Sequence, residues 1–189
     1  MPPKAKFTKE QIAEAGLEII RERGAEGLTA RSLAKKLGSS ACPIFTVYEN
    51  MDEVFARTQK SAKAVYAEYI RKGLSENPAF KGVGTQYIAF AREEPKLFQL
   101  LFMSKTNGNV ENFLPLIDDN YELILRSVRE PYALSEEDAQ NLYTHLMIYT
   151  HGIATLVARK VVAFTDGNID VMLTEVFTGL LKQIKGRQQ

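Results

Sequence analysis

The chain has 189 residues, 45% of them hydrophobic, and a net charge of +1. Its length is enough for one large domain or two small ones. No apolar run approaches the roughly 18 residues of a membrane span, and the N-terminus lacks the apolar stretch of a signal peptide. The single cysteine, Cys42, excludes an intramolecular disulfide framework and fits a reducing compartment, so we expect a cytoplasmic protein with no membrane partner.

Three short helical patterns occupy the first fifty residues, over 8–24, 29–38 and 39–47. Each begins at a serine or threonine that can cap a helix, and the first two end at a glycine. Thr8, with Gln11 three residues later, has the form of a capping box. We therefore predict three short helices in this region.

Longer helical patterns follow. Asn50 caps a fourth helix that continues to about Ser75 and ends before Asn77-Pro78. Turn residues separate the remaining segments, at Gly82-Val83-Gly84, Pro95, 106–109, Pro131 and 165–168. The helices expected between these turns are 84–93, 95–104, 110–130, 135–163 and 168–185. No stretch shows the sustained alternation of a strand, so we predict an all-α fold of about nine helices.

The turn at Gly38 gives the second and third predicted helices the spacing of a helix-turn-helix. In that unit the second helix lies in the major groove of DNA and presents its N-terminal residues to base edges. Helix starts at Thr29, Ser40 and Asn50 offer backbone N–H groups that suit phosphate oxygens. A small three-helix domain without DNA activity is the alternative at this point, because short helices joined by glycines are common.

A set of short motifs lies at fixed offsets between Thr8 and Phe55. The motifs are Gly27-Leu28-Thr29, Leu33-Ala34, Leu37-Gly38, Ser40, Ile44-Phe45, Tyr48 and Asp52-Glu53-Val54. With them, this stretch resembles the N-terminal domain of TetR-family transcriptional regulators. Less specifically, 94–102 and 151–154 resemble a C-terminal domain type of one branch of that family. The resemblance implies a helix-turn-helix DNA-binding domain over 1–50 and a helical ligand-binding and dimerisation domain over 51–189.

The expected DNA contacts combine the helix-turn-helix geometry with this resemblance. Arg31 is the one strong hydrogen-bonding candidate for a guanine edge, and small or apolar side chains on the third helix suit thymine methyl groups. We therefore expect a site rich in A·T pairs. The predicted DNA-contacting residues are Thr29, Arg31, Ser40, Ala41, Pro43, Phe45, Thr46, Tyr48 and Lys6.

Three residues depart from the family pattern. Cys42, Val47 and Met51 stand where a glycine, a histidine and a phosphate-contacting lysine are usual. Loss of the lysine predicts weaker binding, or compensation by Lys4, Lys6 and Lys9 in the N-terminal arm. We interpret Cys42 as a small packing residue and not as a redox switch, because no basic residue lies near it in the sequence.

Aromatic and apolar residues recur at helical spacing through the middle of the chain. Core packing explains most of them, but the resemblance implies that some line an apolar cavity for a hydrophobic or aromatic small molecule. The predicted ligand-contacting residues are Phe98, Phe102, Tyr121, Leu125, His145 and Tyr149. His145 and His151 lie six residues apart without a carboxylate or cysteine cluster, so neither a metal nor a cofactor is expected.

The last two predicted helices carry long apolar faces. Two helix-turn-helix units spaced by about 34 Å are needed for useful specificity, which predicts a homodimer joined as a four-helix bundle. The predicted interface residues are Leu146, Ile153, Val157, Met172, Val176 and Leu180.

These features together predict a ligand-responsive repressor, released from operator DNA by a hydrophobic or aromatic small molecule. The alternative is a helical small-molecule binder or interaction protein whose DNA activity has decayed. An enzyme ranks third, because no nucleophile and base occur at a spacing that would support catalysis.

Overall fold

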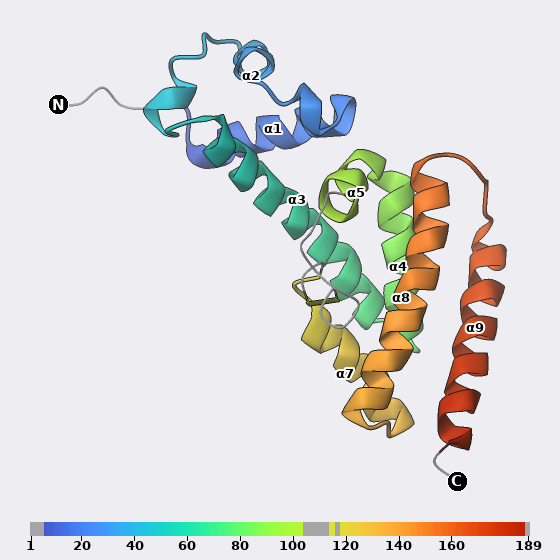
Figure 1. Cartoon of the computed structure of the whole chain (residues 1–189). Coiled ribbons are helices and arrows are strands. Elements are labelled where there is room, and N and C mark those ends of the chain that lie inside the picture. The colour runs from blue at the N-terminus through green and yellow to red at the C-terminus, as the bar shows by residue number, and fades with distance from the viewer. Residues whose placement is uncertain (1–5, 104–113, 116–117, 188–189) are drawn as a thin grey trace. The chain divides into compact units, whose positions relative to one another are not determined.

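The computed structural model describes residues 6–103, 114–115 and 118–187. All regular structure in these ranges is helical, with eight α-helices and two short 3₁₀ helices, so the expected all-α fold is confirmed (Figure 1). The elements are α1 (Lys9–Arg23), η1 (Ala25–Gly27), α2 (Ala30–Lys36), η2 (Ile44–Thr46), α3 (Met51–Leu74), α4 (Ala79–Glu93), α5 (Pro95–Phe102), α7 (Tyr121–Tyr132), α8 (Glu136–Ala158) and α9 (Asp166–Gly186).

Some predictions fall on residues that the structure does not describe: Lys4, the turn at 106–109 and the start of the helix predicted over 110–130. Among the helices that it does describe, none is long and apolar enough to cross a membrane.

The chain divides into two compact units. Unit 1 comprises Met1–Tyr66 and Glu94–Ser104, and unit 2 comprises Ala67–Glu93 and Lys105–Gln189. Unit 1 therefore contains α1, α2, most of α3 and the short helix α5, while unit 2 contains α4, α7, α8 and α9. The functional boundary after residue 50 stays a prediction.

Helix α1 is the centre of unit 1. Its fully buried Ile12 and Ile20 belong to a core shared with Leu33 of α2. At Gly16 the side chain of Thr58 on α3 comes so close that an added Cβ would lie 2.6 Å from the Thr58 hydroxyl oxygen. Thr58 is completely buried, and its hydroxyl donates to the carbonyl of Val54 at 2.8 Å. The missing side chain of Gly16 thus lets α3 pack closely on α1.

The short helix α5 completes unit 1 by packing against α1. Leu97 and Phe98 are fully buried there, and the ring of Phe102 meets Tyr66 edge-on at 4.8 Å. In addition, the Arg21 guanidinium of α1 donates through Nε and Nη2 to the Glu94 carboxylate just before α5, at 3.0 and 2.7 Å.

The expected third helix over 39–47 is not formed. The segment consists of turns and η2, with Ile44 N–H donating to Ala41 and Phe45 N–H donating to Cys42, both at 3.1 Å. Pro43 has no N–H to donate, and so few residues cannot offset the cost of starting an α-helix. Tight turns therefore replace the predicted helix.

The Gly82-Val83-Gly84 stretch lies within α4, where the sequence predicted a turn. A Cβ on Gly82 would lie 2.4 Å from the carbonyl oxygen of Gly73 on α3, and a Cβ on Gly73 would lie 2.7 Å from the Cα of Val83. These glycines allow two helix backbones to touch. The prediction was wrong because the need for glycine comes from a neighbouring helix and not from a turn.

Other helix ends differ from the prediction by a few residues. Helix α7 continues through Pro131 and stops where Ala133 adopts a positive φ of 51°. Helix α8 ends at Ala158, before the predicted 163, because Lys160 adopts a positive φ of 54° and the Val161 N–H donates back to Leu156.

Helix α4 is the core of unit 2 and packs against α7, α8 and α9. Its Ile88 and Phe90 are fully buried, together with Leu142 of α8. Helices α8 and α9 lie side by side (Figure 1). Arg92 forms an ion pair with Asp166 at 2.8 Å, which joins α4 to the start of α9.

A partly buried polar contact joins α4 and α8. The Tyr87 hydroxyl lies 2.9 Å from Nδ1 of His151, and Tyr87 is only 2% exposed. Burial lowers the pKa of His151 below its ordinary value of 6.5. The neutral imidazole is therefore favoured in the fold, and its Nδ1 can accept a hydrogen bond from the Tyr87 hydroxyl.

Replacement of Gly82 by alanine should lower the free energy of unfolding by about 1–3 kcal/mol, because the new methyl group meets the Gly73 carbonyl. Urea denaturation measures this change. The control is Gly167→Ala in the exposed first turn of α9, where the nearest atom to an added Cβ is 3.8 Å away. That variant should gain up to about 1 kcal/mol from helix propensity. Equal effects of the two changes would contradict close helix packing at Gly82.

The free energy of unfolding should fall as pH drops below 6.5, the ordinary pKa of histidine. Between that pKa and the lower one of the folded state, the unfolded chain binds more protons, so acid favours unfolding. Urea titrations at pH values from about 7.5 to about 5.5 measure the slope, which a His151→Gln variant should reduce. A slope that this variant leaves unchanged would assign the effect to other groups.

Candidate nucleic-acid interface

Helix α2 and the segment 39–48 occupy the part of unit 1 where the sequence predicted a helix-turn-helix, with the 3₁₀ helix η2 in place of the expected second helix. Thr29 caps α2 through a capping box, in which its hydroxyl accepts the Ser32 N–H at 3.1 Å and its own N–H donates to the Ser32 hydroxyl. Gly38 then takes a positive φ of 59°, and the Ser39 N–H donates back to Ala34 at 2.9 Å. The left-handed glycine reverses the chain directly into the segment 39–48.

The outer surface of this segment is uncharged. Ser40, Cys42 and Thr46 are exposed, Ala41 and Pro43 are half-buried, and Phe45 is 43% exposed. Phenylalanine is usually buried, so its exposure beside small side chains marks a surface suited to an apolar contact. The fully buried Ile44 anchors the segment to the core of unit 1.

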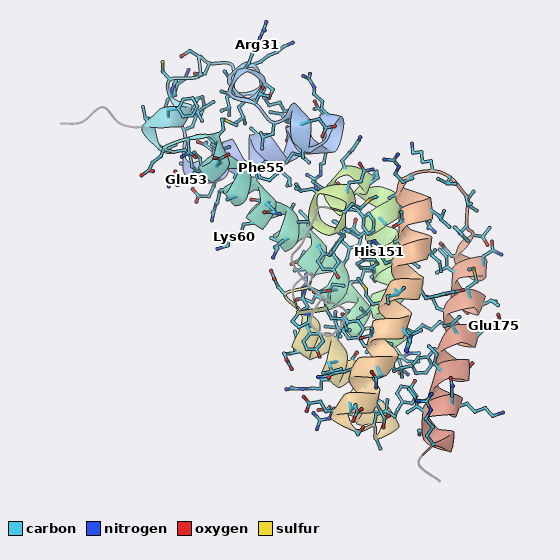
Figure 2. The ribbon with its side chains drawn as sticks, in the orientation of Figure 1. Arg31, Glu53, Phe55, Lys60, His151 and Glu175 are labelled. Atoms are coloured by element: carbon cyan, nitrogen blue, oxygen red, sulfur yellow. The ribbon has the colours of Figure 1, made fainter. Side chains whose placement is uncertain are left out.

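Arg31 is exposed on α2 (Figure 2). Lys35 on the same helix is also exposed. Within the described part of the chain, neither side chain forms an ion pair. Lys36 on the same helix is instead paired with Glu18 and Glu22, at 2.8 and 2.9 Å. Arg31 and Lys35 therefore remain available for an anionic partner. Thr29 and Lys6 are also exposed.

Tyr48 does not belong to this exposed surface. Its side chain is 3% exposed, and its hydroxyl donates to the carbonyl of Lys9 at 2.9 Å. Burial raises the pKa of the Tyr48 phenol. Tyr48 thus fastens the end of the turn segment to α1. We remove it from the predicted DNA-contacting set, because a buried side chain with an occupied hydroxyl cannot meet a base edge.

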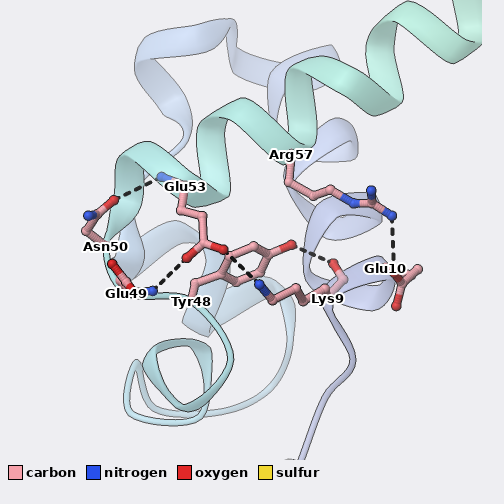
Figure 3. Close-up of polar contacts among 7 residues, drawn as sticks. All are labelled: Lys9, Glu10, Tyr48, Glu49, Asn50, Glu53 and Arg57. Atoms are coloured by element: carbon pink, nitrogen blue, oxygen red, sulfur yellow. Dashed lines mark hydrogen bonds and ion pairs between the residues drawn. The ribbon is translucent and has the colours of Figure 1, made fainter.

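The Glu53 carboxylate in the first turn of α3 is fixed by hydrogen bonds to its neighbours (Figure 3). Asn50 Oδ1 accepts the Glu53 N–H at 2.9 Å, and Glu53 Oε2 accepts the Glu49 N–H at 2.8 Å. Glu53 Oε1 accepts from Lys9 Nζ at 2.7 Å. This hydrogen bond raises the pKa of Lys9 and lowers that of Glu53. Lys9, expected to compensate for the missing lysine at Met51, is instead committed to Glu53.

The sequence contained part of this arrangement. Asn50 with Glu53 three residues later has the spacing of a helix cap, which predicts that a helix begins there. The partner Lys9 lies 44 residues away in the sequence, so local spacing gives no sign of the ion pair.

The predicted ligand-contacting residues belong to both units. Phe98 and Phe102 lie in unit 1 on α5, and the other four lie in unit 2 on α7 and α8. Leu125 is 5% exposed, Tyr149 is half-buried and His145 is exposed. The Tyr121 ring stacks on Tyr143 at 5.9 Å.

Unit 2 gathers a different set of polar groups in its interior. Tyr87 meets His151, and Asp118 is 2% exposed and accepts the N–H and the side-chain amide of Asn120. Burial, and secondarily the charge of Asp118, raise the pKa values of Tyr87 and Tyr143 well above 10.0. No group of histidine, cysteine and acidic residues among the described side chains could hold a metal ion.

The predicted interface residues are only partly at the surface. Leu146 and Ile153 are 5% and 4% exposed, so they belong to the core of unit 2. Val157, Met172, Val176 and Leu180 are half-buried.

A different apolar stripe is exposed on α8. Ile148 is 56% exposed and Leu156 is 37% exposed, with the open Gly152 between them. These positions are four residues apart and share one helix face. Val171 on α9 is 53% exposed. The sequence pattern did not identify Ile148 and Gly152, because α8 carries apolar residues on both its inner and outer sides.

Two comparisons with known proteins complete this description. Residues 80–180, more than half of the chain, match the family described as tetracyclin repressor-like, C-terminal domain. No curated protein matches the chain.

Proposed function

Since this chain belongs to the TetR family of transcriptional regulators, which are not enzymes, we propose that its unit 1 binds operator DNA through the helix-turn-helix of α2 and the segment 39–48. The observation that carries the proposal is the exposed, uncharged surface of that segment together with the exposed Arg31 of α2, which forms no ion pair with the described side chains. Small and apolar side chains can approach thymine methyl groups, and a guanidinium can bind the O6 and N7 atoms of guanine. The proposed DNA-contacting residues are Thr29, Arg31, Ser40, Ala41, Pro43, Phe45, Thr46 and Lys6.

We further propose that the protein is a repressor and that a hydrophobic or aromatic small molecule releases it from DNA. The family match over 80–180 supports an effector domain in unit 2. To release DNA, the effector must bind the conformation that does not bind DNA more tightly than the one that does. Tyr121, Leu125, His145 and Tyr149 stay the proposed contacts in unit 2. Phe98 and Phe102 also stay proposed effector contacts, and they lie on α5 in unit 1.

The paired carboxylate at the start of α3 favours a second candidate. Glu53 and the exposed Asp52 place negative charge beside Met51, where the family usually has a lysine that contacts a phosphate. Negative charge at this position weakens contact with a phosphate. It is therefore consistent with a regulator whose DNA affinity has decayed and which acts as a small-molecule binder. Titration of DNA separates the two functions.

We also propose a homodimer formed by α8 and α9. The exposed stripe of Ile148, Gly152 and Leu156 is apolar, and Gly152 leaves space for close approach of a partner helix. Val157, Met172, Val176 and Leu180 are half-buried and can contribute at the edges, whereas Leu146 and Ile153 support the helices from the core. A self-complementary patch of this kind suits a two-fold symmetric pair.

Arg31→Ala should weaken binding to the DNA that flanks the protein's own gene by about 1–3 kcal/mol and relax the sequence preference at one position. Mobility-shift titrations over a series of salt concentrations measure both effects. The control is Lys35→Ala on the same helix, which should weaken all sequences alike and lower the salt slope by about 1. Unchanged affinity and preference in Arg31→Ala would remove its role as a base reader. Failure of the unaltered protein to shift any duplex at low salt would favour the decayed regulator.

Leu156→Asp should convert the dimer to a monomer, because the charge would be buried without a partner at the helix interface. Sedimentation equilibrium measures the mass. Leu123→Asp on α7, where Leu123 is 53% exposed, introduces the same change on another surface and should leave a dimer. A dimer in both variants would place the interface elsewhere.

A further inference from the structure

We propose that Glu53 restrains DNA binding by holding the Lys9 ammonium and by placing a negative charge next to the DNA-facing segment of unit 1. This inference rests on the proposed operator binding, and it names a residue whose removal should strengthen that function. Its basis is the contact of Glu53 Oε1 with Lys9 Nζ at 2.7 Å, on the surface directly after the segment 39–48 (Figure 3).

The position of the ion pair connects it to DNA binding. Phe45 and Thr46 are exposed, and α3 begins at Met51 only a few residues later. The intervening Glu49 is exposed, as is Asp52. A DNA backbone that follows the exposed segment therefore approaches carboxylates within the Debye length of about 10 Å at 0.1 M salt.

Lys9 is a cation that could offset this charge, and Glu53 holds its ammonium. The side chains of Lys9 and Glu53 are 48% and 38% exposed, so a phosphate can reach the ammonium only in competition with a carboxylate already at hydrogen-bond distance. The ammonium also lies 4.9 Å from the centre of the Tyr48 ring. Each phosphate that a cation contacts releases about one counterion from the DNA, and this release favours binding. A lysine that does not reach a phosphate therefore contributes no such release.

The fold does not need the Glu53 charge to hold α1 against α3. The Tyr48 hydroxyl donates to the Lys9 carbonyl, Arg57 pairs with Glu10 at 3.1 Å, and Thr58 packs into the space at Gly16. Asn50 caps the first turn of α3 by itself through the Glu53 backbone N–H. Exposed ion pairs contribute little to stability, so the larger effect of Glu53 is on an approaching phosphate.

The test compares Glu53→Gln with Glu10→Gln by fluorescence anisotropy, on a labelled duplex from the DNA flanking the gene and on a scrambled duplex of equal length. Both variants remove one negative charge and release one cation, but Glu10 pairs with Arg57, one helical turn further along α3 (Figure 3). Glu53→Gln should bind both duplexes about tenfold more tightly, with a salt slope steeper by about 1. Glu10→Gln should change affinity far less. In the Lys9→Gln, Glu53→Gln double variant most of the gain should be lost.

Circular dichroism melting establishes that each variant is folded, and Glu53→Ser, a second neutral replacement, should show the same gain. Two outcomes overturn the inference while the proposed function stands: the unaltered protein binds DNA and neither neutral variant binds more tightly, or Glu10→Gln gains as much as Glu53→Gln. Binding by Glu53→Gln alone supports it. Absence of binding by all variants at low salt overturns the inference and the proposed function together.

Discussion

The close approach of α1 and α3 at Gly16 sets the geometry of unit 1. Because Gly16 has no side chain, the buried Thr58 fits against α1, and the first turns of α3 are held beside the start of α1. That placement brings Lys9 within reach of both Tyr48 and Glu53. The turn segment is therefore fixed at both ends, by the left-handed Gly38 at its beginning and by the Tyr48 hydrogen bond at its end. An exposed Phe45 can persist on this support because the residues around it are held by the core.

Local sequence predicted the helix starts well where the cap is a short-range hydrogen bond. Thr8 with Gln11 and Thr29 with its neighbours form capping boxes in the structure, and both depend only on residues three apart. Glycines were harder to interpret. Gly38 ends a helix, as expected, but Gly82 lies inside one, because the backbone that requires its small size belongs to Gly73 on another helix. The same residue type thus serves a local need in one place and a tertiary need in the other.

The candidate DNA surface was likewise predictable only where it depends on local sequence. Arg31 follows a helix start and is exposed, so its position can be inferred from the cap at Thr29. Tyr48 and Lys9 could not be assigned from spacing, because their roles come from a contact between residues 39 positions apart. The predicted ligand set is divided between the two units for a related reason: α5 belongs to unit 1, although its neighbours in the sequence belong to unit 2.

That discontinuity has a consequence for how such a protein can be recombined. Unit 1 is built from two separate pieces of chain, and the second piece supplies Leu97 and Phe98, both fully buried, and the Glu94 carboxylate that binds Arg21. A chimaera that took only the first fifty or sixty residues would carry the helix-turn-helix but leave the α5-facing side of α1 open to water. Gene fusion or domain shuffling would then transfer residues 1–50 with an uncovered apolar surface and without the Glu94 carboxylate that binds Arg21. The part of the chain that can be transferred is therefore residues 1–66 together with α5.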